Sequence, residues 1–159
     1  KDQGIIENFS VMKNTTLAYL DDFCTAGYIK TKKEIETTKK FIEDLSIKAS
    51  GYQQLTKYLS GGNQQKVILS RWLNGDFSLG IFDEPTKGID IQAKSEIYEL
   101  IDNLAKAGKA VLFLSSYLPE LITMCDRILV LKNGKKVGEF SPDISDLQSK
   151  VMHAMLGGS

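Results

Sequence analysis

Two short segments set the strongest constraint on what this chain can fold into. Leu59–Lys66 reads LSGGNQQK, in which a serine and two glycines stand at the predicted start of a helix. Leu79–Phe82 is an apolar run of strand length, and Asp83 and Glu84 follow it directly. The first amides of a helix point outward without internal partners, and carboxylates at a strand end can hold Mg²⁺. Together the segments predict an α/β chain that binds phosphate and a divalent cation.

The composition excludes several other classes of protein. Of 159 residues, 42% are hydrophobic and 25% are charged, as in an ordinary globular domain. Twenty basic residues balance twenty acidic ones, which argues against a general nucleic-acid binder. No apolar run approaches the roughly 20 residues of a membrane helix, so we expect any membrane contact to go through a partner. Without a C-x-x-C pair, and with His153 as the only histidine, a zinc site is not expected.

The first part of the chain is predicted to be helical. Residues 1–58 are mostly polar, with apolar residues at roughly helical spacing. These residues are Ile35, Phe41, Ile42 and Leu45. A second helix is predicted to begin at Ser60 and to end at Asn74-Gly75, because glycine often follows a last helical turn. We expect its buried side to consist of Val67, Ile68, Leu69, Trp72 and Leu73.

The second part alternates strands and helices. Asp90 is the expected N-cap of a helix that Gly108 closes, and Asn133-Gly134 between two apolar segments predicts a hairpin. The expected elements are a strand at 79–82, a helix at 91–107, a parallel strand covered on both faces at 110–114, a short helix at 119–125, hairpin strands at 127–131 and 135–140, and a terminal helix at 143–156. This order predicts a helical subdomain at 1–75 followed by part of an α/β core at 76–159.

The Ser-Gly-Gly segment is the candidate phosphate clamp. Glycines let the backbone approach an anion closely, Ser60 adds a hydroxyl donor, and the helix dipole favours negative charge there. On three residues alone, a glycine-rich cap without a ligand is the simpler interpretation. The extended pattern through Lys66 reverses that preference.

LSGGNQQK resembles the signature motif of ABC-transporter ATPases, and its Asn-Gln-Gln-Lys part is similar to the second nucleotide-binding half of bacterial monosaccharide importers. The resemblance implies that Ser60, Gly61 and Gly62 contact the γ-phosphate of ATP held by the P-loop of the opposite half. It also implies nucleotide contacts for Asn63, which stands where most ABC proteins have glutamine, and for Gln64.

LGIFDE at Leu79–Glu84 resembles a Walker B strand, and DEPTKGID resembles that strand with the D-loop. By this resemblance Asp83 holds Mg²⁺ and Glu84 is the general base or the group that orients water. Asp90 would couple two ATP sites across an interface. Ser116 stands where most ABC ATPases have a catalytic histidine, and because a hydroxyl cannot replace an imidazole in full, we expect a weakened site.

The resemblance implies a partial P-loop NTPase fold of the ABC ATPase type: a helical signature subdomain and an incomplete, mostly parallel sheet with a C-terminal hairpin and helix. It implies ATP and Mg²⁺ as cofactors. The implied partners are membrane permease subunits, contacted partly by residues 4–58, the opposite nucleotide-binding domain and, indirectly, a sugar-binding protein. The implied location is peripheral, on the cytoplasmic face of the bacterial inner membrane. No G-x-x-x-x-G-K-[ST] occurs, so we expect an inactive fragment of a sugar-importing ATPase.

Two alternatives stay open. ATPases of nucleoside importers resemble those of sugar importers, and the intact Asp83-Glu84 pair favours the sugar type modestly. As it stands, the chain would also fit a catalytically silent interaction module, because it lacks a group that holds the triphosphate.

Overall fold

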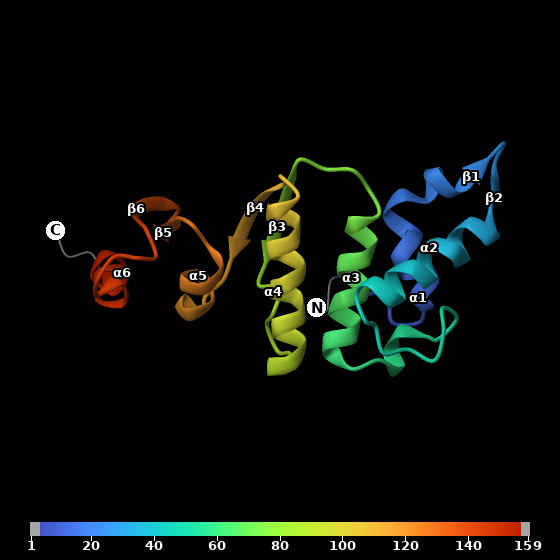
Figure 1. Cartoon of the computed structure of the whole chain (residues 1–159), viewed down its shortest axis with the longest axis horizontal. Coiled ribbons are helices and arrows are strands. Elements are labelled where there is room, and N and C mark those ends of the chain that lie inside the picture. Colours follow the sequence, from blue (N-terminus) through green and yellow to red (C-terminus); the bar gives the residue numbers. More distant parts are fainter. Residues whose placement is uncertain (1–3, 157–159) are drawn as a thin grey trace. The chain divides into compact units, whose positions relative to one another are not determined.

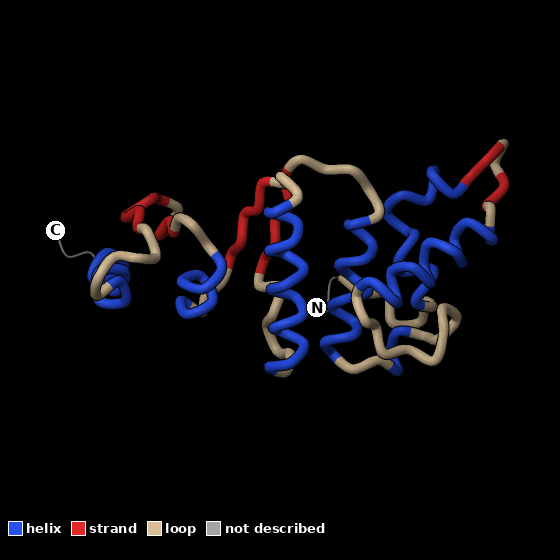
Figure 2. The backbone as a smooth tube through the Cα atoms, viewed as in Figure 1, coloured by secondary structure: helices blue, strands red, loops and turns tan. Residues whose placement is uncertain are grey.

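The structure is a computed structural model that describes residues 4–156, and these form two compact units. One unit comprises the residues up to Ser78 together with Pro85–Ala110. The other comprises Leu79–Glu84 together with the residues from Val111 onward. Helices dominate the first unit, whereas most strand residues belong to the second (Figures 1 and 2). The predicted division into 1–75 and 76–159 stays a prediction.

The helices of the first unit confirm the sequence pattern. Its elements are α1 (Val11–Thr16), the 3-10 helix η1 (Leu17–Phe23), β1 (Cys24–Thr25), β2 (Tyr28–Ile29), α2 (Thr31–Asp44), the 3-10 helix η2 (Thr56–Tyr58), α3 (Gly61–Leu73) and α4 (Ile91–Lys106). The helix α1 packs against α2 and α3, and α3 packs against α4 (Figure 1). The hairpin β1–β2 was not predicted, because two-residue strands show no alternation. Its turn has positive φ at both Ala26 (51°) and Gly27 (81°).

The apolar core of the first unit lies between α1 and α3. Its buried members are Val11, Ile47, Leu59 and Val67. The prediction that Trp72 is buried is wrong, since 56% of its surface is exposed. The inward face of α3 continues from Val67 to Ser70 and Arg71, the i+3 and i+4 positions, so that Trp72 points away from the core.

A buried polar network ties the first residues of the chain to α3. Arg71 donates from Nε to the Asn14 carbonyl (2.7 Å), from Nη2 to Asn14 Oδ1 (2.6 Å) and from Nη1 to the Gly4 carbonyl (2.7 Å). Asn14 Nδ2 in turn donates to the Ile6 carbonyl at 2.9 Å. Burial lowers the pKa of the Arg71 guanidinium below its ordinary value. The network fixes the segment that precedes α1 against α3.

The helix α4 begins and ends where the sequence predicts. Asp90 is its N-cap, and Asp90 Oδ1 accepts from the Ala93 amide at 2.9 Å. Ile97 and Ile101, one turn apart, are buried. Gly108 follows the C-cap with a φ of 84°, the left-handed conformation that glycine adopts at little cost.

The strands β3 (Leu79–Asp83) and β4 (Ala110–Leu114) form a two-stranded sheet. The Ala110 amide donates to the Ser78 carbonyl (2.8 Å), and the Glu84 amide donates to the Leu114 carbonyl (2.9 Å). The beginning of β3 is thus bonded to the beginning of β4 and its end to the end of β4, so the strands run parallel, as predicted. The expected cover on both faces is wrong, because the narrow sheet leaves one row of side chains exposed. This row consists of Leu79, Ile81, Leu112 and Leu114.

The remaining elements of the second unit are α5 (Leu118–Met124), β5 (Ile128–Lys132), β6 (Lys135–Phe140) and α6 (Leu147–Leu156). The predicted hairpin is confirmed: β5 and β6 are antiparallel, and Asn133 and Gly134 have φ angles of 50° and 73°. Buried side chains of α6 pack on the hairpin. The helix α6 begins later than predicted, because Asp146 has a φ of 60° and cannot be part of a helix. Within residues 4–156, no helix combines the length and the apolar character needed to cross a membrane.

Candidate functional site

Two carboxylates lie at the carboxyl end of β3. Asp83 is the last residue of the strand and is exposed. Glu84 follows with a φ of 46°, a left-handed conformation that is uncommon for a residue with a side chain. Its Oε1 accepts a hydrogen bond of 2.7 Å from the Ser116 amide. The half-buried Glu84 side chain is thus held beside the residues that follow β4. Strained backbone of this kind clusters at functional sites.

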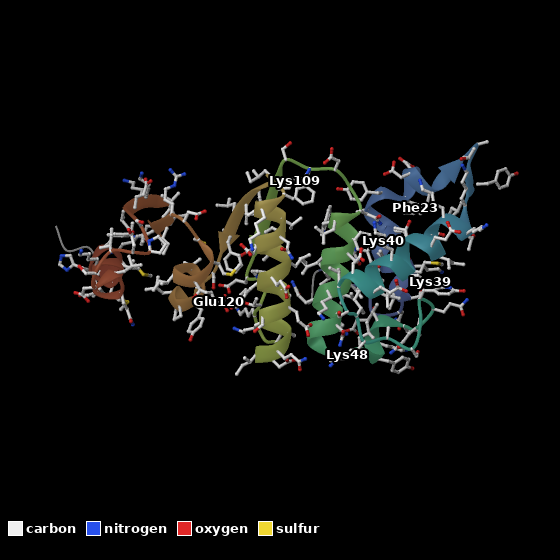
Figure 3. All side chains as sticks on the ribbon, in the orientation of Figure 1. Phe23, Lys39, Lys40, Lys48, Lys109 and Glu120 are labelled. Atoms are coloured by element: carbon white, nitrogen blue, oxygen red, sulfur yellow. The ribbon has the colours of Figure 1, made fainter. Side chains whose placement is uncertain are left out.

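Ser116 contacts Glu84 through its backbone rather than through its hydroxyl. The loop that carries it is fixed by its neighbour, since Ser115 Oγ donates to Glu120 Oε2 (2.9 Å) and accepts from the Tyr117 amide (3.0 Å). Glu120 lies on α5 and is only 4% exposed (Figure 3). Ser115 and Glu120 were not among the predicted site residues. The two hydrogen bonds of Ser115 hold the loop that follows β4 against the start of α5.

The arrangement around Glu84 can orient a water molecule. In the part of the chain that the structure describes, Oε1 is occupied by the Ser116 amide and Oε2 is left to accept from another donor. Asp83 can supply one oxygen ligand to Mg²⁺, which binds one or two carboxylates together with waters and phosphate oxygens. Residues 4–156 contain no group of three or more His, Cys, Asp or Glu that could hold a metal.

The second group of candidate residues lies at the start of α3. Ser60 is the N-cap of this helix, and its exposed Oγ accepts from the Asn63 amide at 3.5 Å. Gly61 and Gly62 form the first turn, whose amides have no acceptors within the helix. An anion that approaches Ser60 would meet these amides and the positive end of the helix dipole.

Gly62 is required by packing as well as by any ligand. A Cβ at this position would lie 2.6 Å from the Ala93 Cβ and 3.7 Å from Asp90 Oδ2. The first turns of α3 and α4 therefore approach each other too closely for any side chain at position 62. This contact places Asp90 next to the Ser-Gly-Gly segment within the first unit.

We expect Gly62→Ala to destabilise the contact between α3 and α4 by about 1–3 kcal/mol, the usual effect of overpacking. Hydrogen exchange of the α3 and α4 amides in the whole protein measures the loss. Because the clash is with the Ala93 methyl group, Gly62→Ala combined with Ala93→Gly should recover protection relative to Gly62→Ala alone. The single variant Ala93→Gly corrects for the lower helix propensity of glycine. A double variant no better protected than Gly62→Ala would contradict the packing explanation.

Gln64 and Lys66, in the second half of LSGGNQQK, make hydrogen bonds and an ion pair inside the first unit. Gln64 is buried and donates from Nε2 to the Thr56 carbonyl at 2.9 Å. Lys66 is buried, forms an ion pair with Glu96 of α4 and donates to the Ser46 carbonyl at 3.1 Å. The nucleotide contact predicted for Gln64 stays a prediction, and its geometry gives it a structural role.

The structure thus groups the predicted residues into two clusters, one in each unit. Ser60, Gly61, Gly62, Asn63 and Asp90 gather where α3 and α4 begin. Asp83, Glu84 and Ser116 gather where β3 and β4 end. His153 is an exposed residue of α6, as expected for an ordinary helix-face position.

The chain is similar along almost its whole length to curated bacterial proteins. The ribose import ATP-binding protein of Geobacillus kaustophilus is 43% identical over 159 residues, which are 100% of this chain and 32% of that protein. The ribose import ATP-binding protein of Pseudomonas putida is 49% identical over 139 residues, 87% of this chain and 27% of that protein. An arabinose import ATP-binding protein of Burkholderia ambifaria is 46% identical over 143 residues, 89% and 28% of the two chains. The chain spans less than a third of the length of these three relatives.

Solved structures show the same fold at low sequence identity. The chain aligns with an inward-facing metal-chelate type ABC transporter at a TM-score of 0.76 and 17% identity, covering 94% of this chain and 59% of that one. An ATP-binding cassette of an ABC transporter in its ADP conformation aligns at a TM-score of 0.72 and 20% identity, covering 95% and 64%. No family model matches the sequence. The predicted fold class, part of an ABC ATPase, is confirmed.

Proposed function

We propose that this chain belongs to the ATP-binding proteins of bacterial ABC sugar importers and serves in the ATP-driven uptake of a simple sugar. The observation that carries the proposal is the similarity to ribose and arabinose import proteins, at 43–49% identity over 87–100% of this chain. In such a protein, binding of ATP would close two ATPase halves, and hydrolysis would let them reopen. This cycle would switch a membrane permease between its two orientations.

The start of α3 would bind the terminal phosphate of ATP held by the P-loop of the opposite half. The Ser60 hydroxyl and the amides of Gly61 and Gly62 are the donors that the geometry offers. Asp90, next to Gly62, would link this contact to the second ATP site. The support is the position of all four residues at two neighbouring helix starts, where backbone amides favour an anion.

The end of β3 would serve hydrolysis. Asp83 would contribute one ligand to Mg²⁺, and Glu84 would orient the attacking water and accept its proton. The Ser116 amide would hold Glu84 for this purpose, since it binds Oε1 and would leave Oε2 to accept from the water. The ion itself would neutralise charge on the phosphates.

The proposed partners follow from the family. Permease subunits would bind partly to the helical residues 4–58, an opposite nucleotide-binding half would complete each ATP site, and a sugar-binding protein would act indirectly. The proposed location is the cytoplasmic face of the bacterial membrane, as a peripheral subunit.

The test is transport by the full-length protein, reconstituted with its permease and binding protein in lipid vesicles. We expect ATP-dependent accumulation of labelled ribose, galactose or arabinose, and no accumulation without ATP. A labelled nucleoside serves as the matched alternative substrate. Accumulation of the nucleoside and of none of the sugars would favour the nucleoside importer. ATP turnover that never drives uptake would contradict a role in transport.

A further inference from the structure

The orientation of the Asn63 side-chain amide is fixed by its neighbours. The Lys48 backbone amide donates to Asn63 Oδ1 at 2.7 Å, beside the start of α3 where Figure 3 labels Lys48. A backbone N–H can only donate, so the oxygen of the Asn63 amide must face Lys48. The nitrogen then faces Ser60, and Nδ2 donates to Ser60 Oγ at 2.7 Å.

This arrangement fills the acceptor positions of the Ser60 hydroxyl. A hydroxyl has one donor and two acceptor positions. Asn63 donates twice to Ser60 Oγ, from Nδ2 at 2.7 Å and from its backbone amide at 3.5 Å. In the described part of the chain, the exposed Ser60 hydroxyl is given no acceptor for its own proton. The proton is therefore left to point outward from the helix start.

We propose that Asn63 is a positioning residue that fixes the Ser60 hydroxyl as a donor toward the terminal phosphate of ATP. The proposal rests on the function proposed above and gives Asn63 a task other than direct contact with the nucleotide. The Lys48 amide fixes which end of the Asn63 side chain faces Ser60, and Asn63 in turn fixes the orientation of the Ser60 hydroxyl proton. A hydroxyl with its proton directed in advance binds an anion without first having to reorient.

Asn63→Asp is the sharpest test, because the side chain keeps its shape and reverses its hydrogen bond. One carboxylate oxygen would still accept from Lys48, while the other would accept from Ser60 and turn the hydroxyl proton inward. We expect the affinity of the full-length transporter for ATP to fall roughly tenfold or more, the usual effect of losing a charge-assisted hydrogen bond. ADP lacks the terminal phosphate, so its affinity should change by less than about twofold.

The affinities are measured with Mg²⁺ in the Glu84→Gln background, which keeps ATP intact. Asn103→Asp introduces the same charge at an exposed position of α4 and serves as the matched control. Asn63→Gln keeps both hydrogen-bonding ends of the amide and should retain most of the preference for ATP over ADP. A purely structural role would lower both affinities together, or would lower the melting temperature without changing their ratio.

Ser60→Ala separates this inference from the proposed function. If Ser60→Ala leaves the ratio of ATP to ADP affinity unchanged, the phosphate contact itself is wrong. If Ser60→Ala lowers the ratio, Asn63→Ala should also lower it in the chain that keeps Ser60. In the Ser60→Ala background, Asn63→Ala should have little further effect, so the two effects should not add. Fully additive effects, or an Asn63→Asp variant with an unchanged ratio, would overturn the positioning role. Should Asn63→Asp fail to fold, the comparison of Asn63→Ala with and without Ser60 decides alone.

Discussion

Glu84→Gln is expected to lower the ATP turnover of the full-length protein by about a hundredfold or more, the range for loss of a general base. The amide oxygen can still accept from the Ser116 amide, which lies 2.7 Å from Oε1 in the wild-type chain. Only the basicity and the charge of the side chain are lost. We therefore expect an unchanged melting temperature, retained ATP binding and abolished sugar uptake. Single-turnover hydrolysis of radiolabelled ATP measures the effect on the chemical step.

Glu99→Gln, an exposed position on α4, removes the same charge and is expected to leave turnover unchanged. Glu84→Ala adds a second comparison, because it also removes the acceptor of the Ser116 amide and should lower the melting temperature as well as turnover. Turnover and uptake that survive Glu84→Gln would mean that the opposite ATP site carries hydrolysis. By the resemblance to ABC ATPases, Ser116 stands where most of these proteins have a histidine, and this makes hydrolysis at the opposite site the main alternative.

Local signals were sufficient to predict most elements. The Asp90 cap, the glycine at 108 and the Asn133-Gly134 turn each act through the backbone of a few consecutive residues, so the sequence alone locates them. The candidate carboxylates were also predictable, because an apolar run that ends in Asp83 and Glu84 places them at a strand end. The pattern LSGGNQQK located the other cluster.

Features that depend on distant contacts were not predictable in this way. The neighbour of Glu84 is the backbone of Ser116, and only the path of β4 and α5 reveals that contact. A lysine is usually exposed, yet Lys66 is buried and pairs with the half-buried Glu96 of α4. Trp72 was assigned to the core by hydrophobicity, whereas Arg71 occupies the inward position. For Lys66 and Arg71, a partner far along the sequence decided which side chain is buried.

Arg71→Met is expected to destabilise the packing of the first residues and α1 against α3 by about 3 kcal/mol. Methionine fills a similar length but donates no hydrogen bonds. Three acceptors lose the Arg71 donor: the carbonyls of Gly4 and Asn14 and the Asn14 side-chain oxygen. Of these, the Asn14 side-chain oxygen still accepts from the Ile6 amide at 3.0 Å. Each buried acceptor left without a partner costs about 1–3 kcal/mol, and relief of the buried charge offsets part of the sum.

Hydrogen exchange of the full-length protein measures this loss locally. Protection of the α1 amides should fall by roughly two orders of magnitude, since about 1.4 kcal/mol corresponds to a factor of ten. Amides of the β5–β6 hairpin belong to the other unit and should keep their protection. Arg127→Met is the matched control, because Arg127 is exposed and pairs with the exposed Glu139 at 3.4 Å. Equal effects of the two arginine variants would show that the buried network does not hold the first residues to α3.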